Sequence, residues 1–477
     1  MILAARRILW AALILSALVL AARAIIGPFH LGVPITSPMN AEGIFALSGI
    51  GLLACPVRKA RQETLTSKVV PMALVAFTLA EIGFVAYAWS LPFPFLADDY
   101  DHIPHAINAT PAYLGALFTQ PAADRFFRPM GFIAYAAEAR IADFNRSDWH
   151  ALAIALHTTI SLLVYLFARR RKFPPLLAAA AALLFLLHGS RPEAVTWISA
   201  QFDLWAALFF LIALLSYESP WSLLALLAAL LSKESAYVYP LVLLFMLWID
   251  RVPREQWPRL AVPPFVLTAA VFVYRWRLVG GIGGYRNIGS DQPYIFTFDF
   301  FRTTKSLTMR LAAALDFPIN WSHALEWWLI AALLAALVAG VALAAGSVDR
   351  RKLTFALGFV LLAALPVHEF LGIGPDLEKS RVLYLPSVGF ALLFATALEG
   401  VRPRVAIAAA CAILAFHTAA LEHNLRIWGS VAHLAERTCQ DLARTNPPVL
   451  PDIPNTVDGV YFLHTGLRGC VEAAAGR

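Results

Sequence analysis

Apolar runs of about 20 residues, separated by polar segments, recur from one end of the chain to the other. Such a run, folded as an α-helix, is long enough to cross a lipid bilayer. The pattern predicts an all-α polytopic membrane protein with about 13 transmembrane helices. The predicted spans are 8–26, 43–57, 69–90, 149–168, 174–189, 195–216, 221–233, 236–250, 260–278, 324–346, 352–370, 383–400 and 404–421.

Two further segments are too polar to cross a membrane, although both contain apolar patches. These are residues 103–148 and 300–316, which we predict to form interfacial helices along the membrane surface. The chain then divides into a transmembrane domain, residues 1–421, and a small polar tail, residues 422–477. Within the first domain, residues 91–148 form the first large loop between spans.

Composition and charge agree with this interpretation and set an orientation. Of the 477 residues, 60% are hydrophobic and only 14% are charged, against roughly 25% charged in ordinary globular domains. The net charge of +7 does not indicate a nucleic-acid partner, because the cations gather in every second loop, as at Arg169–Lys172 and Arg350–Lys352. Cytoplasmic loops carry such an excess. The N-terminus is therefore expected in the cytoplasm, and the 91–148 loop and the tail on the extracytoplasmic side.

An acidic cluster follows the third predicted span. It contains Asp98, Asp99 and Asp101, and a carboxylate beside hydrocarbon is costly to desolvate. Such a carboxylate can take the proton of an acceptor hydroxyl. If that hydroxyl attacks a sugar carbon bonded to a phosphate, the reaction needs no general acid. It needs only cations that stabilise the departing phosphate. Alternatively, these acids cap a helix or belong to a solvated loop.

A second polar stretch lies between two predicted spans on the same side. It contains His188, Arg191, Glu193 and Asp203. These residues are candidates for substrate binding. Alternatively, Arg191 and Glu193 pair with each other, and Asp203 caps a helix or pairs deeper in the bundle.

Two shorter stretches complete the polar side. Lys233 and Glu234 join two apolar runs and are either a structural pair or part of a site. Arg381 and Tyr384 lie three positions apart at the start of a span, so they would share one helical face. A planar guanidinium there suits a phosphate, although interfacial anchors are the alternative. Arg128, in the first large loop, is a further candidate for substrate binding.

Three other features leave two interpretations open. Cys439 and Cys470 lie in the polar tail, where an oxidising compartment would allow a disulfide. Glu81 and His157 lie inside predicted spans. An ionisable group there indicates function by default, but each can also pair within the bundle.

Together these stretches resemble membrane glycosyltransferases of the GT-C class. Within this class, the chain is similar to bacterial protein-mannosyltransferase-like proteins and to the transmembrane O-mannosyltransferases that carry tetratricopeptide repeats. No such repeats follow the last predicted span here. His188–Glu193 departs from the more usual His-Pro-Val-His-x-Glu, which leaves the role of Arg191 open. The blocks that carry the resemblance are Leu96–Asp99, His188–Leu204, Ser232–Ser235 and Tyr384–Phe390.

The resemblance implies a GT-C-like bundle and an inverting transfer of a sugar from a polyprenyl-phosphate donor to an acceptor hydroxyl. It implies Asp98 as the catalytic base and Asp99 as its support. Some members use a divalent metal, Mg²⁺ or Mn²⁺, near these acids, so Asp98 and Asp99 are the candidate ligands. The implied substrate-binding residues are Glu193, Arg191, His188, Lys233, Glu234, Arg381, Tyr384 and Arg128.

The resemblance also implies the inner (plasma) membrane of a bacterium, with the site facing the periplasm. The expected partners are the lipid-linked donor, membrane lipids and an acceptor that is a protein, a lipid or a glycan. Two alternatives are a transporter or flippase of a lipid-linked glycan and a non-catalytic assembly protein of an envelope glycan pathway. A transporter needs polar groups along a midplane path, preferably with repeat symmetry. Here the polar groups gather on one side, no repeat is visible, and the intact acidic pair argues against a degenerate site.

Overall fold

The computed structural model describes residues 2–27, 37–55, 71–120, 126–280, 300–370, 373–447, 449–463 and 465–476. These residues are almost entirely helical, with one antiparallel hairpin of β1 (Thr456–Val457) and β2 (Val460–Tyr461). The α-helices are α1 (Ile2–Ile26), α2 (Pro38–Ala54), α3 (Met72–Tyr87), α4 (Asp99–Ile107), α5 (Pro111–Ala116), α6 (Pro129–Ala142), α7 (Arg146–Arg170), α8 (Pro175–Leu187), α9 (Pro192–Val195), α10 (Gln201–Leu215), α11 (Trp221–Leu230), α12 (Tyr239–Ile249), α13 (Trp257–Val279), α14 (Phe300–Lys305), α15 (Leu311–Asp316), α16 (Trp327–Ala344), α17 (Arg350–Ala364), α18 (Pro386–Glu399), α19 (Pro403–Thr445) and α20 (Leu467–Ala474). The 3₁₀ helices are η2 (Ala88–Ser90), η3 (Ile198–Ala200), η4 (Glu234–Val238), η5 (Arg254–Gln256), η7 (Leu365–Phe370) and η8 (Ser380–Leu383), and η6 (Ser306–Arg310) is a π-helical turn.

Seven helices of the described chain are long and apolar enough to cross a membrane, which identifies an all-α membrane protein. Every predicted span coincides with a helix, but the count of about 13 spans is not confirmed. Several of these helices are short: α8 has 13 residues and α11 has 10. At 1.5 Å per residue, such helices do not reach across the roughly 30 Å of a bilayer by themselves.

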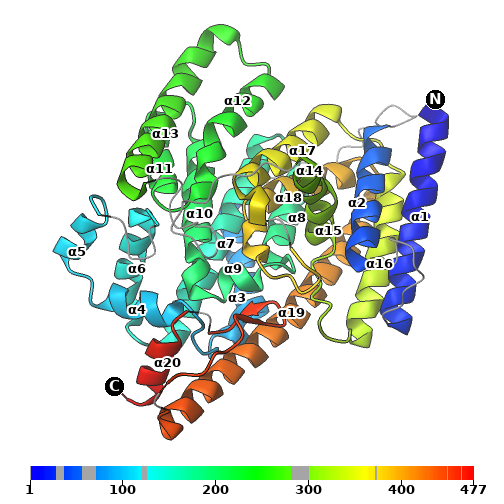
Figure 1. The fold of residues 1–477 in the computed structure, drawn as a ribbon. Coiled ribbons are helices and arrows are strands. Elements are labelled where there is room, and N and C mark those ends of the chain that lie inside the picture. Colours follow the sequence, from blue (N-terminus) through cyan, green and yellow to red (C-terminus); the bar gives the residue numbers. More distant parts are fainter. Residues whose placement is uncertain are drawn as a thin grey trace.

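The bundle is built around α7, α8, α10 and α18, whose buried residues belong to one large apolar cluster. Alanines of α8, such as Ala178, Ala181 and Ala182, are fully buried and let neighbouring helices approach closely. A second cluster joins α1, α2 and α16 to α19 at one side of the bundle (Figure 1). These clusters form the frame that positions the polar segments.

Helix α19 runs for 43 residues and continues past the predicted tail boundary at residue 421. Figure 1 shows its second half projecting from the bundle beside α20 and α4, and we call this end of the molecule the α20 end. Gly429 permits α19 to pass close to Phe93, because a Cβ at Gly429 would lie 2.7 Å from the Phe93 ring. A disulfide joins Cys439 of α19 to Cys470 of α20, so the bond that the sequence left open is formed.

Both segments predicted as interfacial form short helices that pack against other helices of the protein. Helices α4 and α6 pack together through an apolar cluster that includes Ile103, Phe132 and Tyr135, and they lie at the α20 end (Figure 1). Residues 300–316 form α14, η6 and α15, and Met309 lies directly against Gly43 of α2. This second segment therefore packs onto the bundle as well.

Candidate active site

The acidic turn, residues 96–99, lies at the α20 end, where α4 begins. Asp99 is 1% exposed, and its carboxylate accepts hydrogen bonds from the Leu96 N–H (3.1 Å) and from the N–H and hydroxyl of Ser199 (2.7 and 2.6 Å). Asp98 is half-buried and accepts a hydrogen bond from the Thr465 hydroxyl. Its side chain does not cap α4, so the cap interpretation does not apply to Asp98.

The surroundings of the two acids separate their roles. Burial raises the pKa of Asp99 to about 7, and the hydrogen bonds from Ser199 and Leu96 oppose part of this rise. The same Ser199 hydroxyl lies 3.1 Å from Nδ1 of His102, so Asp99 belongs to an internal hydrogen-bond chain. Asp101 is exposed. Of the adjacent pair Asp98 and Asp99, only Asp98 is therefore accessible to a substrate.

Glu193 forms the next part of the site with Arg381. Glu193 lies in the first turn of α9, and its side chain is completely buried. The Arg381 guanidinium, from η8, pairs with this carboxylate, and the Ser380 hydroxyl donates to it at 3.2 Å. Burial raises the pKa of Glu193, and Arg381 and Ser380 oppose the rise. The alternative pair of Arg191 with Glu193 is not formed.

Two aromatic rings flank Arg381. Its Cζ lies 4.8 Å from the ring centroid of Trp197 and 5.0 Å from that of Tyr461, and the two rings stack at 4.8 Å. The Trp197 indole N–H also donates to the Leu96 carbonyl at 3.3 Å. Trp197 therefore connects Arg381 directly to the acidic turn.

Lys233 pairs with Asp203, one helical turn after Ser199. Helix η3 and the start of α10 therefore support both the acidic turn and a cation. Burial lowers the pKa of Lys233 to about 8, and Asp203 opposes this shift. Arg128 and Arg381 lower it further, so these three cations are close enough to influence one another.

Glu234 binds two guanidinium groups. Its carboxylate oxygens lie 2.7 Å from Nη2 of Arg128 and 2.7 Å from Nη2 of Arg275 in α13. Arg128 also stacks on Phe126, with its Cζ 4.0 Å from the ring centroid. The loop before α6 is thus fixed to α13 and η4.

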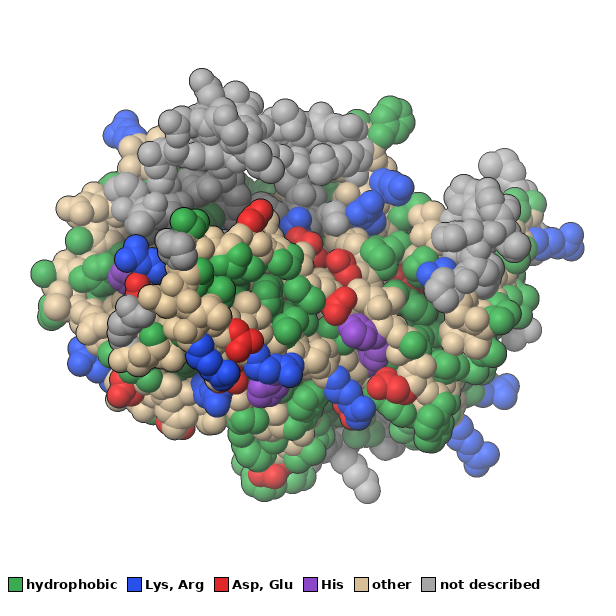
Figure 2. Space-filling model, turned by 60° about the horizontal axis from the view of Figure 1, so that its bottom comes forward, with side chains coloured by type: hydrophobic (Ala, Val, Ile, Leu, Met, Phe, Trp, Pro, Cys, Tyr) green, Lys and Arg blue, Asp and Glu red, His purple; other side chains and the backbone are tan. Residues whose placement is uncertain are grey.

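Ion pairs concentrate in this region of the described structure. Four cations and three carboxylates meet in partly buried surroundings, and such a concentration of cations suits an anion. Figure 2 shows acidic and basic side chains interspersed on the face of the molecule at the α20 end. We call the seven residues the cation cluster: Arg128, Lys233, Arg275, Arg381, Asp203, Glu193 and Glu234.

Tyr135 lies within reach of both the cation cluster and the acidic turn. Burial raises its pKa well above the ordinary range, and Glu138 adds to the rise. Asp99 and Asp98 raise it as well, whereas Arg128 lowers it. Residues of the acidic turn and of the cation cluster therefore both influence the Tyr135 hydroxyl.

His188 and Arg191 are fully buried among the helices. His188 Nε2 lies 2.8 Å from the Leu315 carbonyl oxygen. The Arg191 guanidinium donates to the Phe185 carbonyl at 3.0 Å and pairs with the Ser387 hydroxyl. Both side chains contact packing helices, and neither reaches solvent.

Tyr384 and Arg381 do not share a surface. Tyr384 is 1% exposed, and its hydroxyl lies 2.7 Å from Nδ1 of His157, which places the buried His157 in a pair within the bundle. Glu81, the other ionisable group predicted inside a span, is exposed on α3.

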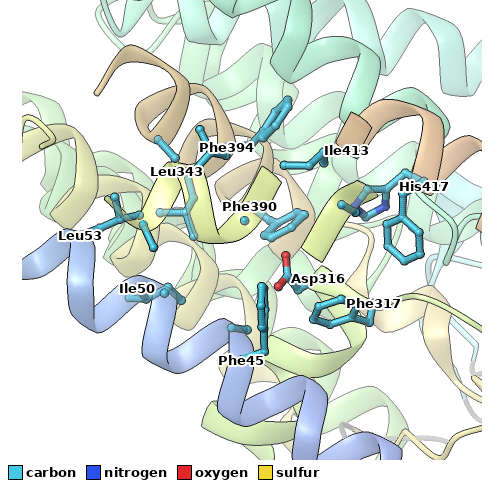
Figure 3. A pocket seen from close by; sticks show the side chains of 18 residues that line it. Phe45, Ile50, Leu53, Asp316, Phe317, Leu343, Phe390, Phe394, Ile413 and His417 are labelled. Atoms are coloured by element: carbon cyan, nitrogen blue, oxygen red, sulfur yellow. The ribbon is translucent and has the colours of Figure 1, made fainter. Parts of the chain in front are cut away.

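An apolar cavity of about 100 Å³ lies between α2, α16, α18 and α19 (Figure 3). A second cavity, of about 270 Å³, lies between α2, α15, α17 and α18 and shares Asp316 and Phe390 with the first. Its lining residues Leu311 and Leu315 belong to the same buried cluster as Leu383, two positions after Arg381. The larger cavity thus lies close to η8.

Asp98 and Asp99, the candidate metal ligands, both have hydrogen-bond partners within the protein. Three donors from the protein already occupy the Asp99 carboxylate, and Asp98 accepts from Thr465. No group of three His, Cys, Asp or Glu side chains suited to a metal occurs in the described part of the chain. We therefore derive no step through a metal ion.

Several residues that complete the site were missed from the sequence. Arg275 had a signal, because it is a cation inside the predicted span 260–278. Ser199, Tyr461 and Thr465 had none, since their partners come from segments distant in the chain.

These features define a helical membrane protein with a charged site at one end of its bundle. Over 105 residues the chain is 28% identical to Protein O-mannosyl-transferase TMTC2 of Mus musculus, and it is 28% identical over the same length to that of Homo sapiens. The similarity covers 22% of this chain and only 13% of each relative. No family model and no solved structure matches the chain.

Proposed function

We propose that this protein is a GT-C-type glycosyltransferase that uses a polyprenyl-phosphate-linked sugar, with Asp98 as general base. The observation that carries the proposal is the accessible Asp98 close to three partly buried cations, Lys233, Arg381 and Arg128. The partial similarity to proteins named O-mannosyl-transferase supports the reaction class.

In this reaction Asp98 takes the proton from an acceptor hydroxyl while the hydroxyl oxygen attacks the anomeric carbon. The bond from that carbon to the phosphate oxygen breaks on the opposite face, so the configuration inverts. The phosphate leaves with the bonding electron pair, and cations stabilise its charge. Asp99, enclosed by Ser199 and Leu96, supports the turn that carries Asp98.

Lys233, Arg381 and Arg128 are the proposed phosphate ligands. Their side chains are 11%, 23% and 11% exposed, so each is sheltered yet reachable. Glu193 and Glu234 orient the guanidinium groups by ion pairing. We assign His188, Arg191 and Tyr384 an indirect role, through the packing of the helices that carry the site.

For the lipid chain of the donor, we propose the cavity of about 270 Å³ beside η8. The site then faces the periplasm of a bacterial inner membrane, and the disulfide in the tail agrees with an oxidising compartment. A transporter or flippase is less well supported, because Arg191 and Tyr384 are closed into packed helices instead of lining a path.

The test is to incubate the purified protein in lipid with a panel of radiolabelled polyprenyl-phosphate sugars and candidate acceptors. We expect release of polyprenyl phosphate with one donor, loss of release in Asp98→Asn and normal release in Asp101→Asn. Asp101 is a matched control, an exposed acid three positions away. Full activity of Asp98→Asn would remove Asp98 from the mechanism. Movement of intact donor across the bilayer without release would favour the transporter.

A further inference from the structure

The C-terminal tail contacts the acidic turn itself. We define the tail cap as β2, α20 and the described residues between them. The Ala97 N–H donates to the Phe462 carbonyl at 3.2 Å, and the Thr465 hydroxyl donates to the Asp98 carboxylate. These two bonds fix one backbone group and one side chain in adjacent residues of the turn.

The turn has a backbone conformation that requires such support. Ala97 has φ of 44°, in the left-handed region that residues with a Cβ rarely adopt, and it is fully buried. Gly466 lies directly on it, because a Cβ at Gly466 would come within 2.1 Å of the Ala97 carbonyl oxygen. The direction in which Asp98 leaves this turn therefore depends on the tail cap.

Two further contacts anchor the cap on either side of the turn. Tyr461 stacks on Trp197 and lies over Arg381, so the cap also reaches the cation cluster. The disulfide of Cys439 with Cys470 ties α20 to the long helix α19. The cap is thus covalently fixed at one end and packed against the cation cluster at the other.

We propose that the tail cap completes the active site, with Thr465 as a positioning residue that aims the Asp98 carboxylate. The inference rests on the proposed function, since it assigns Asp98 the role of base. A base displaced by about 1 Å loses on the order of 100-fold in rate, whereas the donor phosphate still meets its cations. Loss of the contact therefore lowers kcat and leaves the donor KM unchanged.

The first test compares Thr465→Val with Thr465→Ser and Thr438→Val. We expect Thr465→Val to lower kcat by about 10- to 100-fold with unchanged donor KM, and Thr465→Ser to restore it. Thr438 is a matched control in α19, because its hydroxyl bonds only to its own helix at Leu434. A normal kcat in Thr465→Val would overturn the role of Thr465.

The second test does not depend on activity. Hydrogen exchange of the amides of residues 93–107 is compared between the unmodified protein, Gly466→Ala and Gly476→Ala. Both glycines have φ near 70°, but only Gly466 has a neighbour at the Cβ position. We expect faster exchange in Gly466→Ala and in the double variant Cys439→Ser/Cys470→Ser, and no change in Gly476→Ala. Unchanged exchange in the first two would overturn the inference, whereas a protein that consumes no donor would overturn only the proposed function.

Discussion

Glu193 and Arg381 stand 188 positions apart in the chain, yet their side chains form an ion pair beside the acidic turn. The Glu193 side chain has no exposure, and Arg381 is 23% exposed. A carboxylate removed from water this completely depends on its counter-ion, because an unpaired buried charge is costly. The pair thus joins α9 to η8 and also presents the outer edge of a guanidinium to the site.

Replacing Glu193 with Ala should destabilise the protein more than replacing both partners. The single change leaves Arg381 beside apolar and aromatic groups without its carboxylate, at a cost of about 3 kcal/mol. Glu193→Ala/Arg381→Ala removes the uncompensated charge, so we expect part of the stability to return. Thermal unfolding in detergent measures both. Strictly additive losses would show that the two side chains are not coupled.

Asp99 should make stability depend on pH in a defined direction. Its pKa in the folded protein is about 7, against 3.8 for the ordinary carboxyl, so the folded state holds this proton more tightly. The resulting stabilisation is complete below about pH 4 and is lost as pH rises through 7. Asp99→Asn cannot titrate. The NH₂ group of its amide also faces hydrogen-bond donors of Leu96 or Ser199, with which it cannot form a hydrogen bond.

We therefore expect Asp99→Asn to unfold at a lower temperature than the unmodified protein at pH 5, with the gap narrowing by pH 8. The measurement is a thermal melt of both proteins across this range. A gap that widens with pH would contradict the assignment. Asp98→Asn is the comparison, because Asp98 is only half-buried.

The sequence predicted where helices form better than how many cross a membrane. Apolar runs report which residues avoid water, and each predicted span proved helical. They do not distinguish a spanning helix from a short one such as α11, which a turn and η4 separate from α12. The prediction also ended the last span at residue 421, where charges appear, although one apolar face of α19 continues and packs against Trp197 and Phe462.

Partner choice within the site was less predictable. Arg191 and Glu193 are two positions apart, so neighbouring charges suggested a pair, but α9 points Glu193 toward Arg381 while Arg191 turns to Phe185. Such choices depend on helix crossings that no local pattern records. The roles proposed for Asp98 and Lys233 remain predictions.

Lys233 should make donor binding weaken at alkaline pH. Burial lowers its pKa to about 8, so its positive charge, available to a phosphate below that pH, is lost above it. We expect the donor KM to rise as pH increases from 7 to 9, and Lys233→Arg to remove this dependence because a guanidinium stays charged. Lys233→Met should raise the donor KM about 10-fold at pH 7, and the difference from the unmodified protein should shrink towards pH 9. Lys352→Met is the matched control, since Lys352 pairs with Glu399 at 2.8 Å outside the proposed site. An equal effect of both Met variants would assign the change to stability instead of binding.

Glu234 should contribute more to stability than a carboxylate that neutralises one cation. It binds Arg128 and Arg275 together, and these two side chains are 11% and 5% exposed. Glu234→Gln removes the charge that both guanidinium groups share, so we expect a loss of about 3 kcal/mol. Glu399→Gln, which affects only the pair with Lys352, should cost less.

Adding Arg275→Met to Glu234→Gln removes one of the two like charges and should recover part of the loss, as measured by thermal unfolding. If Arg275→Met instead lowers the stability of Glu234→Gln by as much as it lowers that of the unmodified protein, charge compensation by Glu234 is not the cause. The packing of α13 then explains the stability of this region.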